Sequence, residues 1–160
     1  YPNLLNAIKI LKNKTNKKFH LKIAGDGELR LTIEKMIDNL GLNDVVSLLG
    51  RRSDIPFLLN QADIFVLASE FEGLPTVVLE AIACECYVVA TDCGGTSEIM
   101  GDTGQLVPTK NSPALALALE KTIELMSIER QDNNIKARTR IEKNFSLEAS
   151  VNTWLRHYEK

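Results

Sequence analysis

The chain has 160 residues, a hydrophobic content of 44% and a formal net charge of −2. This length fits one domain with its own core, and the composition excludes a disordered chain. Basic residues form no dense patch, which argues against nucleic acid as a partner. The sequence shows no signal peptide, and no apolar run approaches the roughly 20 residues of a membrane span.

The chain has three cysteines, an odd number without a disulfide framework, which suits a reducing compartment. The spacing of Cys84 and Cys86 does not match a zinc site, and neither His20 nor His157 lies in a metal motif. We therefore predict no metal site and interpret the cysteines, Cys93 included, as small core residues.

Apolar periodicity and turn residues predict helices and short strands in alternation. In chain order we expect helix 2–14, strand 19–24, helix 28–40, strand 45–49, a short helix from a cap at Ser53 or Asp54 through Asn60, strand 64–68, helix 75–84, strand 87–91, a short helix near 97–100, strand 105–107, helices 112–126 and 128–143, and a final amphipathic helix that bears Val151, Trp154, Leu155 and Tyr158.

Particular residues predict where four of these helices begin or end. Gly41 is expected to end its helix as a left-handed cap. Pro75 is expected at a first helical position. Ser112, followed by a proline, and Ser146 are expected to cap the starts of two later helices.

Alternating apolar strands and helices predict an α/β fold in which a parallel sheet is covered by helices on both faces. Ligands of such sheets bind beyond the carboxyl ends of the strands. The loops at those ends are 25–27, 50–52, 69–74 and 92–96.

Two carboxylates in and after the third of these loops are the most informative residues. Glu72 precedes a Gly-Leu-Pro break, and Glu80 stands eight residues later between apolar neighbours. We expect Glu80 to be buried, at a cost of about 1–3 kcal/mol unless a partner hydrogen-bonds it. A ribose diol is one such partner, whereas an arginine or a backbone amide is another. Glu72 can accept sugar hydroxyls, or it is an ordinary solvated loop acid.

The helix expected from residue 75 directs its amino end at the same crevice. Its first amides lack internal partners and carry partial positive charge. The backbone amides of Gly73, Leu74, Thr76 and Val77 are therefore candidate donors to a phosphate. The alternative is an ordinary turn from strand to helix.

The remaining loops carry weaker signals. The loop that begins at Gly25 is not a dinucleotide fingerprint, because Arg30 occupies the third glycine position. Arg51 and Arg52 can approach a base or a phosphate, or they are simply solvated. The pair at 94–95 is either a simple turn or a close backbone approach, and no catalytic triad can be assembled.

The run "ADIFVLASEFEGLPTVVLEAIACECYVVATDCGGTSEI" resembles the signature of the retaining family 4 glycosyltransferases, the glycosyl transferases group 1. The segments "IAGDGELR" and "GQLVP" and the closing Phe-Ser-Leu-Glu are similar to that family too. The resemblance covers nearly the whole chain.

The resemblance implies a Rossmann-like domain, the C-terminal, donor-binding half of a GT-B enzyme, over residues 1–160. Carried over, Glu72 is the catalytic residue and contacts the donor sugar, while Glu80 contacts the ribose. The amides from Gly73 to Val77 hold the diphosphate, and the loops at Gly25 and at Arg51 and Arg52 belong to the donor site. The family needs no metal or other cofactor, and the donor is a UDP-sugar or GDP-sugar.

The chain also departs from the family. Glu85 and Tyr87 stand where the family usually has glycine and proline, which affects the shape of that turn. The first strand, the cations that stabilise the leaving diphosphate and the N-terminal acceptor domain are expected to lie in a longer polypeptide. Without the first strand, two strand edges are expected to be open.

The resulting hypothesis is a glycosyltransferase domain for transfer of a sugar to a glycan or lipid-linked acceptor in polysaccharide or lipopolysaccharide biosynthesis. Its expected location is the cytoplasm, at the inner face of the membrane. Peripheral membrane association is the second interpretation of the basic run Lys12, Lys14, Lys17 and Lys18, which otherwise solvates a helix end. The alternatives are a GT-B-like nucleotide-sugar epimerase and a non-catalytic nucleotide-sugar-binding module.

Overall fold

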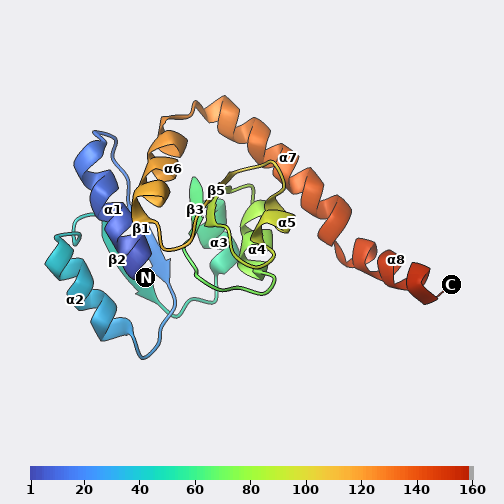
Figure 1. Cartoon of the computed structure of the whole chain (residues 1–160), viewed down its shortest axis with the longest axis horizontal. Helices are drawn as coiled ribbons and strands as arrows, with labels where there is room; N and C mark the ends of the chain where they lie inside the picture. The colour runs from blue at the N-terminus through green and yellow to red at the C-terminus, as the bar shows by residue number, and fades with distance from the viewer. Residues whose placement is uncertain (159–160) are drawn as a thin grey trace.

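The computed structural model describes residues 1–158 and contains five strands and eight helices (Figure 1). In chain order the elements are α1 (Pro2–Lys14), β1 (Leu21–Ala24), α2 (Arg30–Leu40), β2 (Val46–Gly50), α3 (Ile55–Asn60), β3 (Ile64–Leu67), α4 (Thr76–Ala83), β4 (Tyr87–Thr91), α5 (Thr96–Met100), β5 (Gln105–Val107), α6 (Ser112–Glu124), α7 (Ser127–Phe145) and α8 (Leu147–Tyr158). The predicted alternation of strands and helices is confirmed.

All strand pairs are parallel, as expected, but the strands form two sheets where the sequence predicts one. β1 pairs with β2, and β4 lies between β3 and β5. Within residues 1–158 no strand pairs with both β1 and β3, so each of these strands is an edge of its sheet.

Strand β4 divides the hydrophobic core into two clusters. Alternate side chains of a strand point to opposite faces. Tyr87 and Val89 pack with α1, α2 and α6, whereas Val88 and Ala90 pack with α3, α4, α5 and α7. Every residue of β4 is buried, which agrees with a central strand covered by helices on both faces. The predicted Rossmann-like α/β class is therefore correct.

The two-stranded sheet is covered less completely. Leu21 and Ile23 pack into the first cluster, whereas the alternate residues Lys22 and Ala24 are exposed. Helix α7 packs on the second cluster through Ala137 and Ile141, and α8 continues from it away from the rest of the molecule (Figure 1).

The ends of several elements differ from the prediction by one or two residues. β1 begins at Leu21 and α2 at Arg30, two residues later than predicted in each case, because irregular backbone precedes β1 and a turn precedes α2. Such shifts are typical of element ends, where local signals are weakest.

Two helix caps are as predicted. Gly41 ends α2 with φ 65° and ψ 47°, the left-handed cap. The hydroxyl of Ser146 accepts a hydrogen bond of 3.1 Å from the amide of Ala149 at the start of α8.

The starts of three other helices differ in part from the prediction. Asn111 caps α6 instead of Ser112, because its Oδ1 accepts from the amide of Ala114 at 2.9 Å. Asp54 precedes α3 as predicted, but its carboxylate makes no cap hydrogen bond. Pro75 has φ −73° and an extended ψ of 94°, so it precedes α4, which begins at Thr76.

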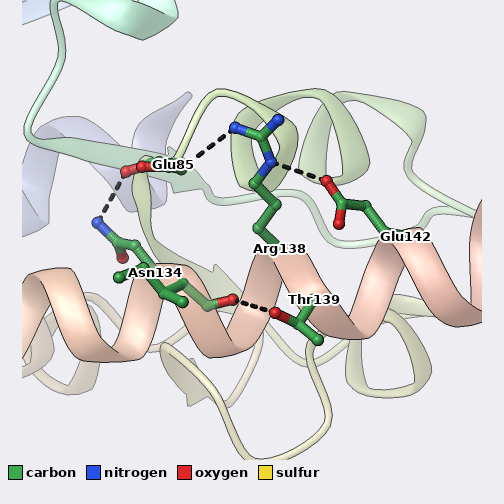
Figure 2. Close-up of polar contacts among 6 residues, drawn as sticks. Glu85, Asn134, Arg138, Thr139 and Glu142 are labelled. Carbon is green, nitrogen blue, oxygen red and sulfur yellow. Dashed lines mark hydrogen bonds and ion pairs between the residues drawn. The ribbon is translucent and has the colours of Figure 1, made fainter.

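The turn that ends α4 contains Glu85 in the left-handed conformation, with φ 57°. The amides of Glu85 and Cys86 donate to the carbonyls of Ile82 and Ala81 at 3.0 Å, which closes the helix end. Figure 2 shows that side chains of α7 support this turn: Asn134 donates to the carbonyl oxygen of Glu85 at 2.7 Å, and Arg138 donates to its carboxylate. The departure from the usual glycine therefore leaves the turn intact.

The predicted amphipathic helix at the C-terminus is present as α8. Its apolar side chains remain exposed, among them Trp154 and Tyr158, whose rings stack with centroids 6.4 Å apart. No helix within residues 1–158 combines the length and the apolar character that crossing a bilayer requires.

Candidate functional site

The loops at the carboxyl ends of the strands form two groups, one on each sheet. The first group joins the ends of β1 and β2, and the second joins the ends of β3 and β4. No hydrogen bond or ion pair among residues 1–158 links the two groups.

The first group brings Gly25 next to the loop that follows β2. The amide of Gly25 donates to the carbonyl oxygen of Gly50 at 2.8 Å. A cavity of about 320 Å³ opens beside this contact, and its lining includes Gly25, Ile23, Leu48 and Arg30. The structure therefore places a cavity with both apolar and charged walls at the predicted Gly25 loop.

The two arginines of this group differ in their surroundings. Arg52 donates two hydrogen bonds to the carboxylate of Asp54, at 2.8 and 2.6 Å. The hydrogen bond from Arg52 lowers the pKa of Asp54, and the same pairing raises the pKa of Arg52. Arg51 is exposed and has no ion-pair partner among the described residues, so it is the more accessible of the two.

The second group is a close backbone packing of the loop 69–75 against the loop 92–95. The amide of Gly95 donates to the carbonyl oxygen of Gly73 at 2.7 Å. A Cβ atom on Gly94 would lie 1.9 Å from the carbonyl oxygen of Glu72. The glycine pair is therefore both a turn and a close backbone approach, and the partner of that approach is this loop.

The start of α4 presents a set of unpartnered amides. Within the described residues, no backbone or side-chain hydrogen bond uses the amides of Gly73, Leu74, Thr76 or Val77, and all four residues are exposed. Because Pro75 lies outside the helix, Thr76 supplies its first amide. These donors and the positive end of the helix dipole suit an anion.

Glu80 is exposed, so the prediction that it is buried is wrong. Its apolar neighbours in sequence do not surround it in space, because α4 buries the face that carries Val78, Ala81 and Ile82. Glu80 lies one turn after Thr76, on the opposite, exposed face of the helix. The carboxylate is thus open to solvent, about one turn from the unpartnered amides.

Glu72 is half-buried, and its backbone lies in the contact between the two loops. The neighbouring Glu70, which is exposed, forms an ion pair of 3.0 Å with Lys110. The loop therefore holds one carboxylate with a cationic partner and another, Glu72, without an ion-pair partner in the described part of the chain.

Sequence reasoning did not single out Thr91, although it anchors the second group. Its fully buried hydroxyl donates to the carbonyl oxygen of Ser69 at 2.6 Å. The available signal was a threonine that ends a strand of otherwise apolar residues, because a buried hydroxyl requires a partner.

The curated relatives include transferases and synthases. The N-acetyl-alpha-D-glucosaminyl L-malate synthase of Bacillus anthracis is 34% identical over 122 residues, which cover 75% of this chain and 31% of the relative. The GalNAc-alpha-(1->4)-GalNAc-alpha-(1->3)-diNAcBac-PP-undecaprenol alpha-1,4-N-acetyl-D-galactosaminyltransferase of Campylobacter jejuni is 31% identical over 156 residues, which cover 95% of this chain and 42% of the relative. The chain thus spans less than half the length of each.

Solved structures match over almost the entire chain. A glycosyltransferase from Rickettsia africae has a TM-score of 0.85 at 27% identity, over 99% of this chain and 43% of its own. Anabaena Alr3699/HepE in complex with UDP and glucose has a TM-score of 0.80 at 25% identity, over 99% of this chain and 45% of its own. The family model described as "Glycosyl transferases group 1" matches residues 1–142, and the chain belongs to this family.

Proposed function

We propose that this chain is the donor-binding, C-terminal part of a retaining GT-B glycosyltransferase of family 4. It binds a UDP-sugar or GDP-sugar, from which the whole enzyme transfers a hexose. The observation that carries the proposal is the arrangement at α4: four unpartnered, exposed amides lie between Glu72 and Glu80.

The diphosphate of the donor binds at the start of α4. The amides of Gly73, Leu74, Thr76 and Val77 donate to its oxygens, and the helix dipole adds favourable potential. The exposure of all four residues leaves room for a ligand of this size.

The two carboxylates bind the two parts of the donor on either side of the diphosphate, the ribose and the sugar. Glu80, one turn into the helix, accepts hydrogen bonds from the ribose hydroxyls. Glu72, at the other side of the amides, contacts the donor sugar and is the catalytic residue. A carboxylate beside the sugar also stabilises positive charge that develops on the ring in the transition state.

The base lies at the first group of loops. Gly25 lets the backbone approach closely, and Arg51 is accessible for stacking or hydrogen bonding. Arg52 has one of two roles. Either it releases Asp54 and contributes to binding of the base, or it keeps its hydrogen bonds to Asp54 and holds the loop in place.

The acceptor is a glycan or a lipid-linked glycan, bound by an N-terminal domain. The relatives support this class, because one is named as acting on a diphospho-undecaprenol glycan and another, from Salmonella typhi, as a Vi polysaccharide biosynthesis protein. An acceptor of this kind places the enzyme in polysaccharide or lipopolysaccharide biosynthesis, in the cytoplasm and peripherally at the inner face of the membrane. No metal ion or other cofactor is required in this proposal.

Isothermal titration of the 160-residue chain with UDP, GDP and ADP tests donor binding. Heat with UDP or GDP is expected, and Glu80→Gln is expected to weaken binding by about tenfold because one hydrogen-bonded contact is lost. Glu70→Gln is the matched control, since Glu70 stands in the same loop but pairs with Lys110. Absence of heat with all three nucleotides would refute the proposal.

Turnover by the complete enzyme tests catalysis. Glu72→Gln is expected to reduce transfer by about a hundredfold or more while UDP affinity stays within about twofold, because UDP lacks the sugar. Product analysis without an acceptor separates this function from the epimerase, which would release an altered nucleotide-sugar. Normal transfer by the Glu72 variant would contradict the catalytic assignment.

A further inference from the structure

We infer that Gly94 and Thr91 are positioning residues for Glu72. Both contact backbone carbonyl groups of the loop that carries Glu72 and so fix the position of that loop. The inference rests on the proposed function, because Glu72 is there the residue that meets the donor sugar. Neither Gly94 nor Thr91 touches the donor in this arrangement.

Gly94 is the point of closest approach between the two loops. A Cβ atom at this position would lie 1.9 Å from the carbonyl oxygen of Glu72 and 2.5 Å from that of Gly73. Both atoms belong to the backbone, so no side-chain rotation can make room. The φ of 53° at Gly94 is also a conformation that glycine adopts without strain. Any other residue here must displace the loop or the turn.

Hydrogen bonds fix the loop on both sides of Glu72. The hydroxyl of Thr91 donates to the carbonyl oxygen of Ser69 at 2.6 Å, and the amide of Gly95 donates to that of Gly73 at 2.7 Å. Thr91 is 0% exposed, so water does not compete for its hydroxyl. Glu72 thus stands between two anchored carbonyl groups.

The supporting turn is itself held by a buried threonine. Thr96, also 0% exposed, donates from its hydroxyl to the carbonyl oxygen of Cys93 at 2.6 Å. The turn 92–95 therefore has internal support, and a displacement at Gly94 passes to the Glu72 loop, whose residues 70, 71, 73 and 74 are exposed. A shift of about 1 Å at a site residue is enough to reduce activity by about a hundredfold.

The first experiment compares Gly94→Ala with Gly41→Ala. Both glycines have left-handed φ angles, 53° and 65°, but a Cβ atom on Gly41 meets no atom closer than 4.0 Å. The control therefore carries the same backbone strain without the overlap. Both variants are measured at a temperature at which circular dichroism shows each to be folded.

Hydrogen exchange of the Gly95 amide, which donates to the carbonyl oxygen of Gly73, and titration with UDP and GDP are the two measurements. In Gly94→Ala we expect faster exchange of this amide. We also expect UDP or GDP binding weakened by about tenfold or more, because the phosphate-binding amides of Gly73 and Leu74 move together with Glu72. In Gly41→Ala we expect both to stay within about twofold of the parent chain. Parent-like exchange and binding in Gly94→Ala would overturn the inference.

The two measurements separate this inference from the proposed function. If the parent chain binds neither UDP nor GDP, the proposed function fails, while the exchange of the Gly95 amide still decides whether Gly94 holds the loop. If the parent chain binds and Gly94→Ala binds equally well with unchanged exchange, only the positioning role fails.

Thr91 provides a second test that does not depend on the folding of the glycine variant. Thr91→Val keeps the shape but removes the hydroxyl, whereas Thr91→Ser keeps the hydroxyl. In the valine variant we expect faster exchange of the Gly95 amide and UDP or GDP binding weaker by about fivefold, because the amides of Gly73 and Leu74 move with the loop. In the serine variant we expect recovery of both to within about twofold. Equal behaviour of the two variants would show that the hydroxyl has no positioning role.

Discussion

Arg138 donates a hydrogen bond of 2.8 Å to Oε1 of Glu85 and so joins the middle of α7 to the turn that ends α4 (Figure 2). A second hydrogen bond, of 2.9 Å, runs from Arg138 to Glu142 on the same helix. Asn134 reaches the carbonyl oxygen of Glu85 from one turn earlier. Helix α7 therefore secures one end of the helix whose other end carries the candidate site.

Replacement of Glu85 by glycine should stabilise the protein. The left-handed conformation costs a non-glycine residue about 1–2 kcal/mol. The ion pair with Arg138 contributes little in return, because both side chains are nearly half exposed to solvent. We expect a gain of about 0.5–1 kcal/mol in the free energy of unfolding, measured by urea denaturation.

A variant of Arg138 tests how much of the stability change comes from the lost ion pair and how much from the relief of backbone strain at Glu85. Arg138→Ala should reduce stability by less than about 1 kcal/mol, and it should have a smaller effect in the Glu85→Gly background. A loss of stability in Glu85→Gly would mean that the ion pair outweighs the backbone strain.

Replacement of Gly104 by alanine should destabilise the protein strongly. A Cβ atom there would lie 2.4 Å from the carbonyl oxygen of Val88, and the φ of 67° adds strain. We expect a loss of more than about 2 kcal/mol, because the overlap is with the backbone of the central strand. Gly41→Ala, with a similar φ and open space, should lose only about 1 kcal/mol. Equal losses in urea denaturation would show that the steric overlap relaxes freely.

The three cysteines should differ in their reaction with iodoacetamide. Burial raises the pKa of Cys86 from 9.0 to about 11, so only about one thiol in a thousand is ionised at pH 8. Its thiol also donates to the carbonyl oxygen of Leu59 at 2.8 Å. Mass spectrometry of the native chain should show labelling of half-buried Cys84 before buried Cys86 and Cys93. Prior labelling of Cys86 would contradict the structure.

Acid should weaken the protein through three exposed carboxylates. Hydrogen bonds from Lys12, Arg52 and Lys136 lower the pKa values of their partners Asp44, Asp54 and Asp102 below 3.8. A lowered pKa in the folded state adds stability above the unfolded value and loses it as the pH falls through the folded value.

The urea midpoint should therefore be flat above about pH 5 and fall below about pH 4. The effect is small because these side chains are solvated, and it should shrink in high salt. An otherwise identical chain with asparagine at positions 44, 54 and 102 should show a shallower decline. An identical decline in both chains would assign the acid sensitivity to other groups.

The elements could be predicted from the sequence because their signals are local. The apolar spacing in α1 and the glycine that ends α2 determine structure within one or two turns. The cap of α6 was misassigned because Asn111 and Ser112 are both good caps, and tertiary structure directs Ser112 to Asn3 instead, at 2.9 Å.

The site was harder to predict because burial depends on the period of the helix more than on neighbours in sequence. Val77 and Leu79 made Glu80 look enclosed, yet a rotation of about 100° per residue places it on the outer face of α4. The packing of Gly94 against Glu72 joins residues from different loops, and a single sequence carries no record of such a contact. The glycine pair signalled close approach without naming its partner.

The separation of the strands into two sheets gives a bound nucleotide a second effect. A donor whose base lies at Gly25 and whose diphosphate lies at α4 would bridge β1–β2 and β3–β4–β5, which share no backbone hydrogen bonds among the described residues. Part of its binding free energy would then appear as cooperativity between the two halves. Local opening of either sheet would then also require release of the nucleotide, and its cost would rise by that binding free energy.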